Sequence, residues 1–150
     1  MAVVLGLAFA LPSSAAGSRS GKKQSITIPR LAITATIGTS LGRGAIYWDR
    51  VGRPGQGTTV ALAAHDVTPV PGFHGHGPFH DIDQLRKGDL IAVTRAGKHY
   101  AYRVTGHRVM SSANMHIADL TRYERLLLTT CWPRGSSRYR LVVYARPAKL

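Results

Sequence analysis

The sequence predicts an all-β domain, a closed barrel of about eight strands with one or two short helices. Apolar and polar residues alternate in several short stretches, which is the period of a strand with one buried face. Glycine, proline and small polar residues separate these stretches, as is typical of turns between strands. Helical spacing is confined to two short segments, too little for the helices that connect parallel strands.

The first predicted strands lie within residues 26–37, where Ile26 and Ile28 alternate with polar neighbours. A glycine-rich connector at residues 38–44 leads to a short strand at residues 45–48. A turn-rich loop follows and separates this strand from the next apolar run.

Residues 58–64 form an almost unbroken apolar run, consistent with a buried strand, and the run ends at His65. The loop at residues 66–77 is rich in proline, glycine and histidine. Loops of this length in a compact domain are usually functional or mobile. A short helix is predicted within residues 79–85, because apolar residues recur there every third position.

Strands are predicted at residues 90–94 and 100–104, joined by a hairpin turn at residues 96–98. Residues 111–123 are less regular, with one helical turn expected near residues 117–120. With the helix predicted within residues 79–85, this makes two short helical segments, as expected for the predicted barrel.

The last two predicted strands carry the residues that suggest chemistry. Residues 126–130 run directly into Cys131, and Pro133 then interrupts regular pairing because proline has no N–H to donate. After a small polar turn, the strand at residues 141–144 begins directly after Arg140. The simplest interpretation is two neighbouring strands with a thiol at the end of one and a guanidinium at the start of the other.

Composition limits the domain count and the partners. A chain of 150 residues with 44% hydrophobic content suits one domain with a real core. Twenty Lys and Arg against seven Asp and Glu give a net charge of +13, which favours an anionic partner: nucleic acid, a membrane surface or an acidic cell-wall polymer. The basic residues are scattered, with the densest group at residues 18–23, and form no stripe interleaved with aromatics. Nucleic-acid binding is therefore not predicted.

The N-terminal segment, residues 1–16, resembles the apolar core and small-residue end of an export signal. Its apolar run stops at Leu11, too short to span a bilayer alone, and no basic residues precede it. We expect a signal peptide or a trimmed membrane anchor, and an apolar N-terminal strand is the alternative. Residues 17–24 are then a basic linker, and residues 25–150 form the catalytic domain.

The single cysteine excludes a disulfide within the chain. In an exported protein a lone cysteine is either a reactive thiol or an accident, and a buried cysteine that acts as a small hydrophobe is the alternative. The position of Cys131 at a strand end, with a histidine and an arginine placed as described, favours a catalytic thiol.

Four segments, in this order along the chain, carry a resemblance to a known family. They are Ile-Thr-Ile-Pro-Arg-Leu-Ala-Ile at residues 26–33, Thr-Val-Ala-Leu-Ala-Ala-His at 59–65, Gly-Pro-Phe at 77–79 with Leu-Arg-Lys-Gly-Asp at 85–89, and Leu-Thr-Thr-Cys at 128–131 followed by Arg-Leu-Val-Val at 140–143. Together they resemble the sortases, bacterial cysteine transpeptidases that attach proteins to the cell envelope. The last segment is similar to the Thr-Leu-x-Thr-Cys signature of that family and its following arginine.

The resemblance implies a transpeptidase that needs neither metal nor other cofactor. It implies that Cys131 attacks a peptide carbonyl, that His65 exchanges the proton, and that Arg140 binds the oxyanion or the substrate backbone. Thr130 is a further candidate for substrate binding. The implied substrate is a C-terminal sorting signal of the Leu-Pro-x-Thr-Gly type, cut through a thioester on Cys131 and joined to a cell-wall amine.

The chemistry predicts a bell-shaped pH dependence. A thiol attacks as the thiolate, and moving a proton from an ordinary cysteine to an ordinary histidine costs about two pK units, roughly 2.7 kcal/mol. Only about one pair in a hundred is then ionic, a fraction that a nearby cation such as Arg140 raises. Activity requires one group deprotonated and the other protonated, so it falls at both pH extremes.

Two residues depart from the family pattern: Leu127 replaces the first threonine of the signature, and Ala64 stands where glycine usually precedes the histidine. The Thr-Cys-x-Pro pattern leans toward sortase classes D and E, for which we expect a Leu-Ala-x-Thr-Gly signal. The expected location is the extracellular face of the membrane of a Gram-positive cell, with the anionic envelope as a partner. A cysteine hydrolase with the same site and a non-catalytic, basic envelope-binding barrel are the alternatives.

Arg138 is the rival for the guanidinium role, because residues two apart on a strand point to the same face. We favour Arg140 because it directly precedes the Leu-Val-Val run, as the arginine of the family does. Arg138 is then an ordinary surface charge.

His74, His76 and His80 invite a metal hypothesis, since closely spaced histidines can bind one ion. They lie between glycines in a loop and have no matching acidic partner, so we predict loop histidines and no metal site. Calcium binding needs clustered carboxylates, and only Asp81 and Asp83 are close in sequence, so no calcium site is predicted.

Overall fold

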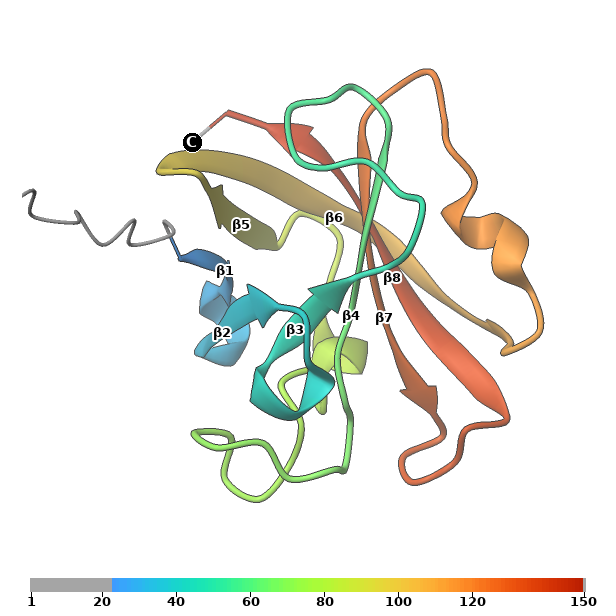
Figure 1. Cartoon of the computed structure of the whole chain (residues 1–150). Coiled ribbons are helices and arrows are strands. Elements are labelled where there is room, and N and C mark those ends of the chain that lie inside the picture. The colour runs from blue at the N-terminus through green and yellow to red at the C-terminus, as the bar shows by residue number, and fades with distance from the viewer. Residues whose placement is uncertain (1–22, 150) are drawn as a thin grey trace, which may run out of the picture.

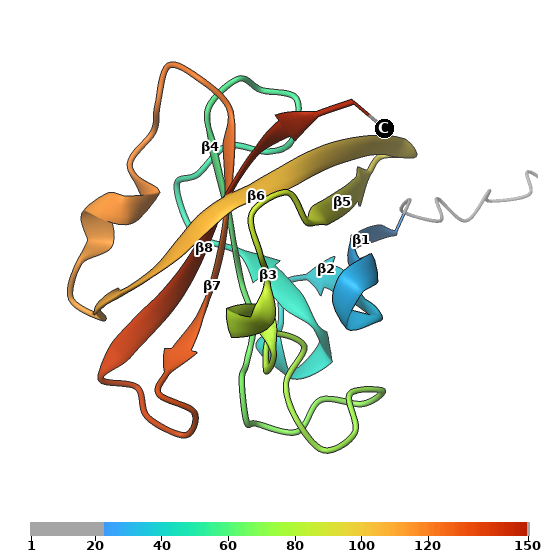
Figure 2. The ribbon, with the colours of Figure 1, turned by 180° about the vertical axis from the view of Figure 1, so that it is seen from behind.

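The computed structural model describes residues 23–149, which form a closed eight-stranded β-barrel in the order β1-β2-β3-β4-β7-β8-β6-β5 (Figures 1 and 2). The strands are β1 (Gln24–Ile28), β2 (Ile33–Gly38), β3 (Ala45–Tyr47), β4 (Thr59–Ala63), β5 (Leu90–Arg95), β6 (Lys98–Ser111), β7 (Arg125–Trp132) and β8 (Tyr139–Ala148). The predicted barrel is confirmed. The signal-like segment at 1–16 and residues 17–22 of the predicted linker lie outside the described residues, and Gln24, the last residue of that linker, begins β1.

The expected short helices are single 3-10 turns. The structure has η1 (Pro29–Leu31), η2 (Leu41–Arg43), η3 (Ile82–Gln84) and η4 (Met115–Ala118). Phe79, Ile82 and Leu85 are all buried, and their three-residue spacing matches a 3-10 turn, with three residues per turn, better than an α-helix. Within residues 23–149, none of the helices has the length and apolar character needed to cross a membrane.

Parallel pairing of β4 and β7 positions the chemistry. Ala63 lies opposite Thr129 in this pair, so both strands leave the barrel at the same end, β4 toward His65 and β7 toward Cys131. β8 returns antiparallel to β7 and places Arg140 directly opposite Cys131. Three positions far apart in sequence therefore meet at one end of the barrel.

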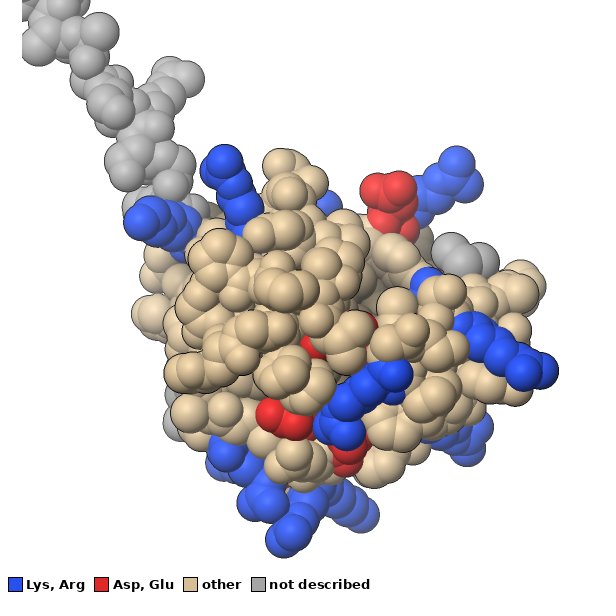
Figure 3. Space-filling view, turned by 90° about the horizontal axis from the view of Figure 1, so that it is seen from below, with Lys and Arg blue, Asp and Glu red and all other residues tan. Residues whose placement is uncertain are grey.

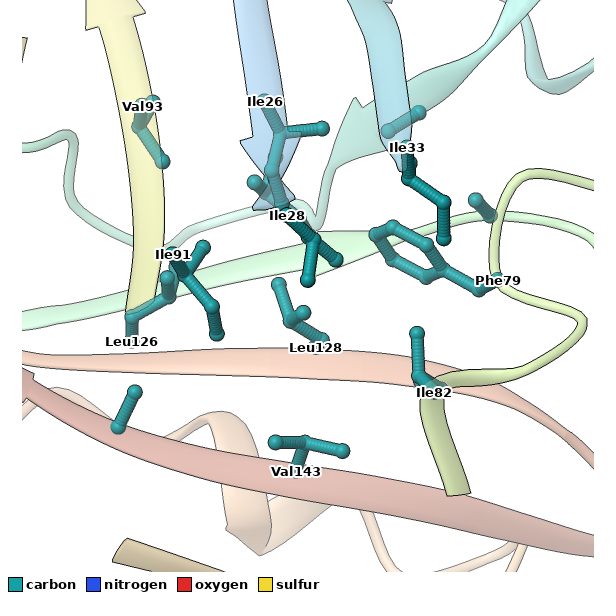
Figure 4. Close-up of a cluster of buried hydrophobic side chains, with 14 of the residues drawn as sticks. Ile26, Ile28, Ile33, Phe79, Ile82, Ile91, Val93, Leu126, Leu128 and Val143 are labelled. Atoms are coloured by element: carbon teal, nitrogen blue, oxygen red, sulfur yellow. The ribbon is translucent and has the colours of Figure 1, made fainter. Parts of the chain in front are cut away.

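The barrel interior is filled mainly by aliphatic side chains, together with Phe79 and Tyr102 (Figure 4 shows part of this cluster). Leu126 and Leu128 of β7 point inward and are fully buried, and burying a leucine in this way stabilises a fold by about 1.5–3 kcal/mol. Leu127 points to the other face, where it packs with Ala61 and Val142 in a second cluster. Because β4 and β7 are covered on both faces, their sequences are continuous apolar runs without alternation.

A carboxylate holds the starts of these two strands together. The buried Tyr102 hydroxyl donates a hydrogen bond of 2.6 Å to Glu124, just before β7. Burial raises the pKa of Tyr102, and the hydrogen bond to Glu124 raises it further. Glu124 also accepts hydrogen bonds from the backbone N–H groups of Gly55 and Gly57, at 3.0 and 2.9 Å, in the loop before β4. One side chain thus joins β6 to the two loops that lead into β4 and β7.

Replacing Glu124 by alanine is expected to lower the free energy of unfolding by about 1–3 kcal/mol, because the buried Tyr102 hydroxyl loses its acceptor. Chemical denaturation measures the loss. The double variant Glu124→Ala with Tyr102→Phe should recover part of it, since it leaves no buried hydroxyl unpaired. Equal losses in the single and double variants would contradict this interpretation.

Candidate active site

His65, Cys131 and Arg140 line one pocket of about 380 Å³ at the end of the barrel where β4 and β7 finish. All three side chains are partly exposed, so an incoming ligand can reach them. Apolar side chains of Trp48 and Ile46 form part of the wall. The structure therefore brings together the three residues that the sequence singled out as catalytic candidates.

The Arg140 guanidinium is fixed beside the sulfur. Its Nη1 donates to Cys131 Sγ at 3.5 Å. The same nitrogen lies 3.0 Å from the carbonyl oxygen of Ser137 and 3.2 Å from that of Tyr139. Because these contacts are to backbone at the start of β8, the cation is already in place beside the thiol before any substrate arrives.

His65 begins a loop that is anchored on both sides. Its carbonyl oxygen accepts a hydrogen bond from the N–H of Phe79 at 3.0 Å, and Phe79 is buried in the core. The carbonyl oxygen of Asp66 accepts from the N–H of Gly77 at 2.9 Å and from Nδ1 of His80 at 2.9 Å. The two ends of the loop at residues 66–77 are therefore bonded to each other next to His65.

Thr130 joins the two strand ends. Its buried hydroxyl donates a hydrogen bond of 2.9 Å to the carbonyl oxygen of Ala64, so β4 and β7 are tied together immediately before His65 and Cys131. The neighbouring Thr129 hydroxyl is also buried and has no hydrogen-bond partner among residues 23–149. The sequence suggested Thr130 for substrate binding, and its hydroxyl is here bonded within the protein.

Two polar links that the sequence analysis missed connect the loop after β4 to the turn after β7. The buried carboxylate of Asp66 accepts the N–H of Gly135 at 3.1 Å. Arg134 bridges Asp81 and Asp83 at 3.3 and 2.8 Å, so these carboxylates are already paired with a cation. Figure 3 views this end of the barrel, where the few acidic side chains lie next to basic ones. In the sequence, the structural role of Asp66 could be suspected only from its position, because it is an acidic residue directly after His65 in a basic chain.

Arg138 does not line the pocket. It precedes β8, which begins at Tyr139, and its exposed guanidinium lies over the Tyr139 ring at 5.3 Å from the centroid. Of the two arginines considered, only Arg140 contacts the sulfur.

The loop histidines lie beside a separate hollow. The rings of His76 and His80 stack with centroids 3.9 Å apart, and His74 lines the same hollow. Among the described residues, no group of three or more His, Cys, Asp or Glu side chains is arranged to hold a metal ion. The stacked rings pack against each other and do not converge on a common point.

Comparison with known proteins gives one family. The family model described as Sortase domain matches residues 26–148. Sortase SrtE1 of Streptomyces coelicolor is 32% identical in an alignment of 96 residues that covers 57% of this chain and 25% of the relative. The matched part of this chain therefore spans a quarter of the length of that curated relative.

Solved structures have the same fold. Sortase C of Clostridium perfringens, determined with the C-terminal cell wall sorting motif, is 28% identical with a TM-score of 0.73, covering 84% of this chain and 70% of that one. Sortase E1 of Streptomyces coelicolor, with a tripeptide in the active site, is 24% identical with a TM-score of 0.71, covering 86% and 88%. The second likeness concerns the fold alone.

Thr130→Val is expected to lower the free energy of unfolding by about 1 kcal/mol, because it removes the hydrogen bond to Ala64. Thr129→Val is the matched control on the same strand. It removes a buried hydroxyl without a partner and should leave stability unchanged or raised. Denaturant titration of both variants measures the difference, and equal effects would contradict the assignment.

Gly77→Ala is expected to displace the backbone of His65, because a β-carbon on Gly77 would clash with the His65 carbonyl oxygen. Overpacking of this kind costs about 1–3 kcal/mol of stability, and NMR resonances of His65 should shift. Gly38→Ala is the control, since a β-carbon there meets nothing within 4 Å. Unchanged His65 resonances in the Gly77 variant would show that the loop does not position this residue.

Proposed function

The chain belongs to the sortase family, and we propose that it is a cysteine transpeptidase that acts on C-terminal sorting signals. The observation that carries this proposal is the shared pocket of His65, Cys131 and Arg140, with a guanidinium nitrogen 3.5 Å from the sulfur. A thiol, an imidazole and a fixed cation are the groups that acyl transfer through a thioester requires.

In the first half of the reaction, the Cys131 thiolate attacks the carbonyl carbon of the peptide bond after the threonine of the signal. A carbon–sulfur bond forms, and the carbonyl oxygen becomes an oxyanion to which Arg140 donates a hydrogen bond. His65, as imidazolium, gives its proton to the departing amine as the carbon–nitrogen bond breaks. The products are a thioester on Cys131 and the released C-terminal peptide.

In the second half, an amine attacks the thioester carbonyl. His65, now neutral, accepts the proton of the incoming amine. The carbon–sulfur bond breaks and the thiolate is regenerated beside Arg140. Because the cation is held by the backbone of Ser137 and Tyr139, little reorganisation is needed in either half.

We assign Thr130 a positioning role in this cycle. Its hydroxyl donates to Ala64, one residue before His65, and the residue itself directly precedes Cys131. A hydrogen bond at this place holds the two reacting side chains at a constant separation, which is what catalysis by proximity requires.

The proposed substrate is a Leu-Pro-x-Thr-Gly or Leu-Ala-x-Thr-Gly signal. The similarity to a sortase C determined with a cell wall sorting motif supports a signal of this class. The alanine form follows from the class D and E leaning of the sequence, with which the 32% identity to Sortase SrtE1 agrees. The apolar walls formed by Trp48 and Ile46 suit the apolar residues of either signal.

Sortases act at the cell envelope, and we propose that this chain works on the extracellular face of the membrane with a cell-wall amine as acceptor. The net charge of +13 suits an anionic envelope as surroundings. The segment at residues 1–16 is proposed as a signal peptide or part of an anchor.

Incubation with a panel of sorting-signal peptides should give a thioester on Cys131 that mass spectrometry detects. Cys131→Ala should abolish it, and His65→Ala should lower kcat/KM by about 10²–10⁴-fold through loss of the general acid. Arg140→Ala should lower kcat/KM by about 10²–10³-fold, whereas Arg138→Ala, the matched control, should leave it nearly unchanged.

Other outcomes would replace the proposal. Cleavage that no added amine converts into transfer would indicate a cysteine hydrolase with the same site. No thioester with any peptide of the panel, together with envelope binding that Cys131→Ala leaves intact, would indicate a non-catalytic envelope-binding barrel.

A further inference from the structure

A second hollow of about 380 Å³ lies at the opposite end of β7 and β8 from Cys131. Arg125, at the start of β7, and Arg146, in β8, line it. Each lies six residues along its strand from Cys131 or Arg140, which is about 20 Å at the rise of a strand. The hollow, named here the basic groove, shares no lining residue with the catalytic pocket.

The basic groove concentrates uncompensated positive charge. Arg108, Arg125, Arg146 and His107 line it, and no Asp or Glu does. Within residues 23–149, none of these arginines forms an ion pair with a carboxylate. Three like charges around one hollow repel one another unless an anion lies between them.

Two of the guanidiniums are held in place. Arg125 donates from Nε to the Thr59 hydroxyl at 3.0 Å and from Nη2 to the carbonyl oxygen of Ile117 at 2.8 Å. Arg146 stacks over the Tyr123 ring, 4.0 Å from its centroid. A site whose cations are already ordered loses less side-chain entropy when an anion binds.

Glu124, the acidic residue between Tyr123 and Arg125 in the sequence, forms no ion pair with the groove arginines within residues 23–149. The Glu124 carboxylate is engaged by the Tyr102 hydroxyl and by the N–H groups of Gly55 and Gly57. The hydrogen bonds of this carboxylate therefore hold the fold, although its neighbours Tyr123 and Arg125 both line the groove.

The backbone is irregular at the same place. The β6–β8 register shifts between Val104 and Gly106, and the Thr105 hydroxyl donates to the carbonyl oxygen of Tyr144 at 3.2 Å. Such bulges twist a strand locally and are over-represented beside functional sites. Thr105, Gly106 and Tyr144 all line the groove, so the irregularity and the charge coincide.

We propose that the basic groove binds phosphate groups of an anionic envelope polymer made of phosphodiester-linked units. The choice of an envelope polymer rests on the proposed function, and the anion site rests on the groove itself. Tetrahedral phosphate oxygens can accept hydrogen bonds from several guanidiniums at once, which suits Arg108, Arg125 and Arg146 around one hollow. Bound there, the polymer would keep the enzyme at the wall while the pocket of Cys131 stays free.

Two other polyanions fit the groove less well. A bilayer surface is flat, whereas the arginines line a concavity that a chain can enter. Single-stranded nucleic acid needs free aromatic faces for base stacking, and Arg146 already covers one face of Tyr123.

The test is binding of poly(glycerol phosphate) to the full chain, measured by calorimetry at several salt concentrations. Arg108→Gln with Arg146→Gln should weaken binding at least about tenfold and flatten the salt dependence, because charge-assisted contacts are lost. Arg86→Gln with Lys87→Gln, two exposed positions outside the groove, is the control with the same change in net charge and should have a small effect. Peptide transfer should be unchanged in both double variants.

Equal weakening by the two double variants, or no binding of the polymer to the unaltered chain, would overturn the proposal. Stronger binding to anionic vesicles or to an oligonucleotide than to the polymer, lost with Arg108 and Arg146, would assign the groove to a membrane or to nucleic acid instead. Absence of peptide transfer by the unaltered chain, with polymer binding retained, would count against the proposed activity. The proposal that the groove binds an anionic polymer would stand.

Discussion

The site depends on one strand pairing, the parallel contact between β4 and β7. Parallel strands end at the same edge of a sheet, so His65, just beyond β4, and Cys131, near the end of β7, emerge side by side. The hydrogen bond from Thr130 to Ala64 closes this pair at the last position before the chemistry begins. Any change that let the two strands slide would separate the imidazole from the thiol, whatever the condition of the rest of the barrel.

Some polar groups around the pocket are candidates for the reaction, and others form hydrogen bonds that hold the surrounding loops in place. Arg140 is placed by antiparallel register opposite Cys131 and by backbone carbonyls at the start of β8. The buried carboxyl group of Asp66 accepts a hydrogen bond from the N–H of Gly135 and so ties one loop to the next. At the other end of the same strands, Glu124 joins two loops in the same way, through hydrogen bonds from Gly55, Gly57 and Tyr102. Within residues 23–149, neither Asp66 nor Glu124 forms an ion pair with an arginine of the two basic sites, and both carboxylates are bonded to the scaffold.

The strands, the barrel and the three candidate catalytic residues could be predicted because they depend on local sequence patterns. Alternating or continuous apolar runs gave the strands, and the barrel was expected because little helical sequence remained to connect parallel strands. Cys131 stood out as the single thiol at a strand end, His65 as the histidine after an apolar strand, and Arg140 as the cation that begins the following strand. The short helical segments are single 3-10 turns, and spacing by three over so short a stretch does not distinguish a 3-10 turn from an α-helix.

From sequence alone, then, came the strands, the fold class and the residue types fit for thiol chemistry, since these depend on periods of two and on positions next to a strand. Tertiary structure decided which strands are neighbours and which side chains share a cavity. Thr130 and Ala64 are 66 residues apart, and the arginines of the basic groove come from three strands. No local period encodes such contacts, because they arise only when the barrel closes and brings distant segments into register.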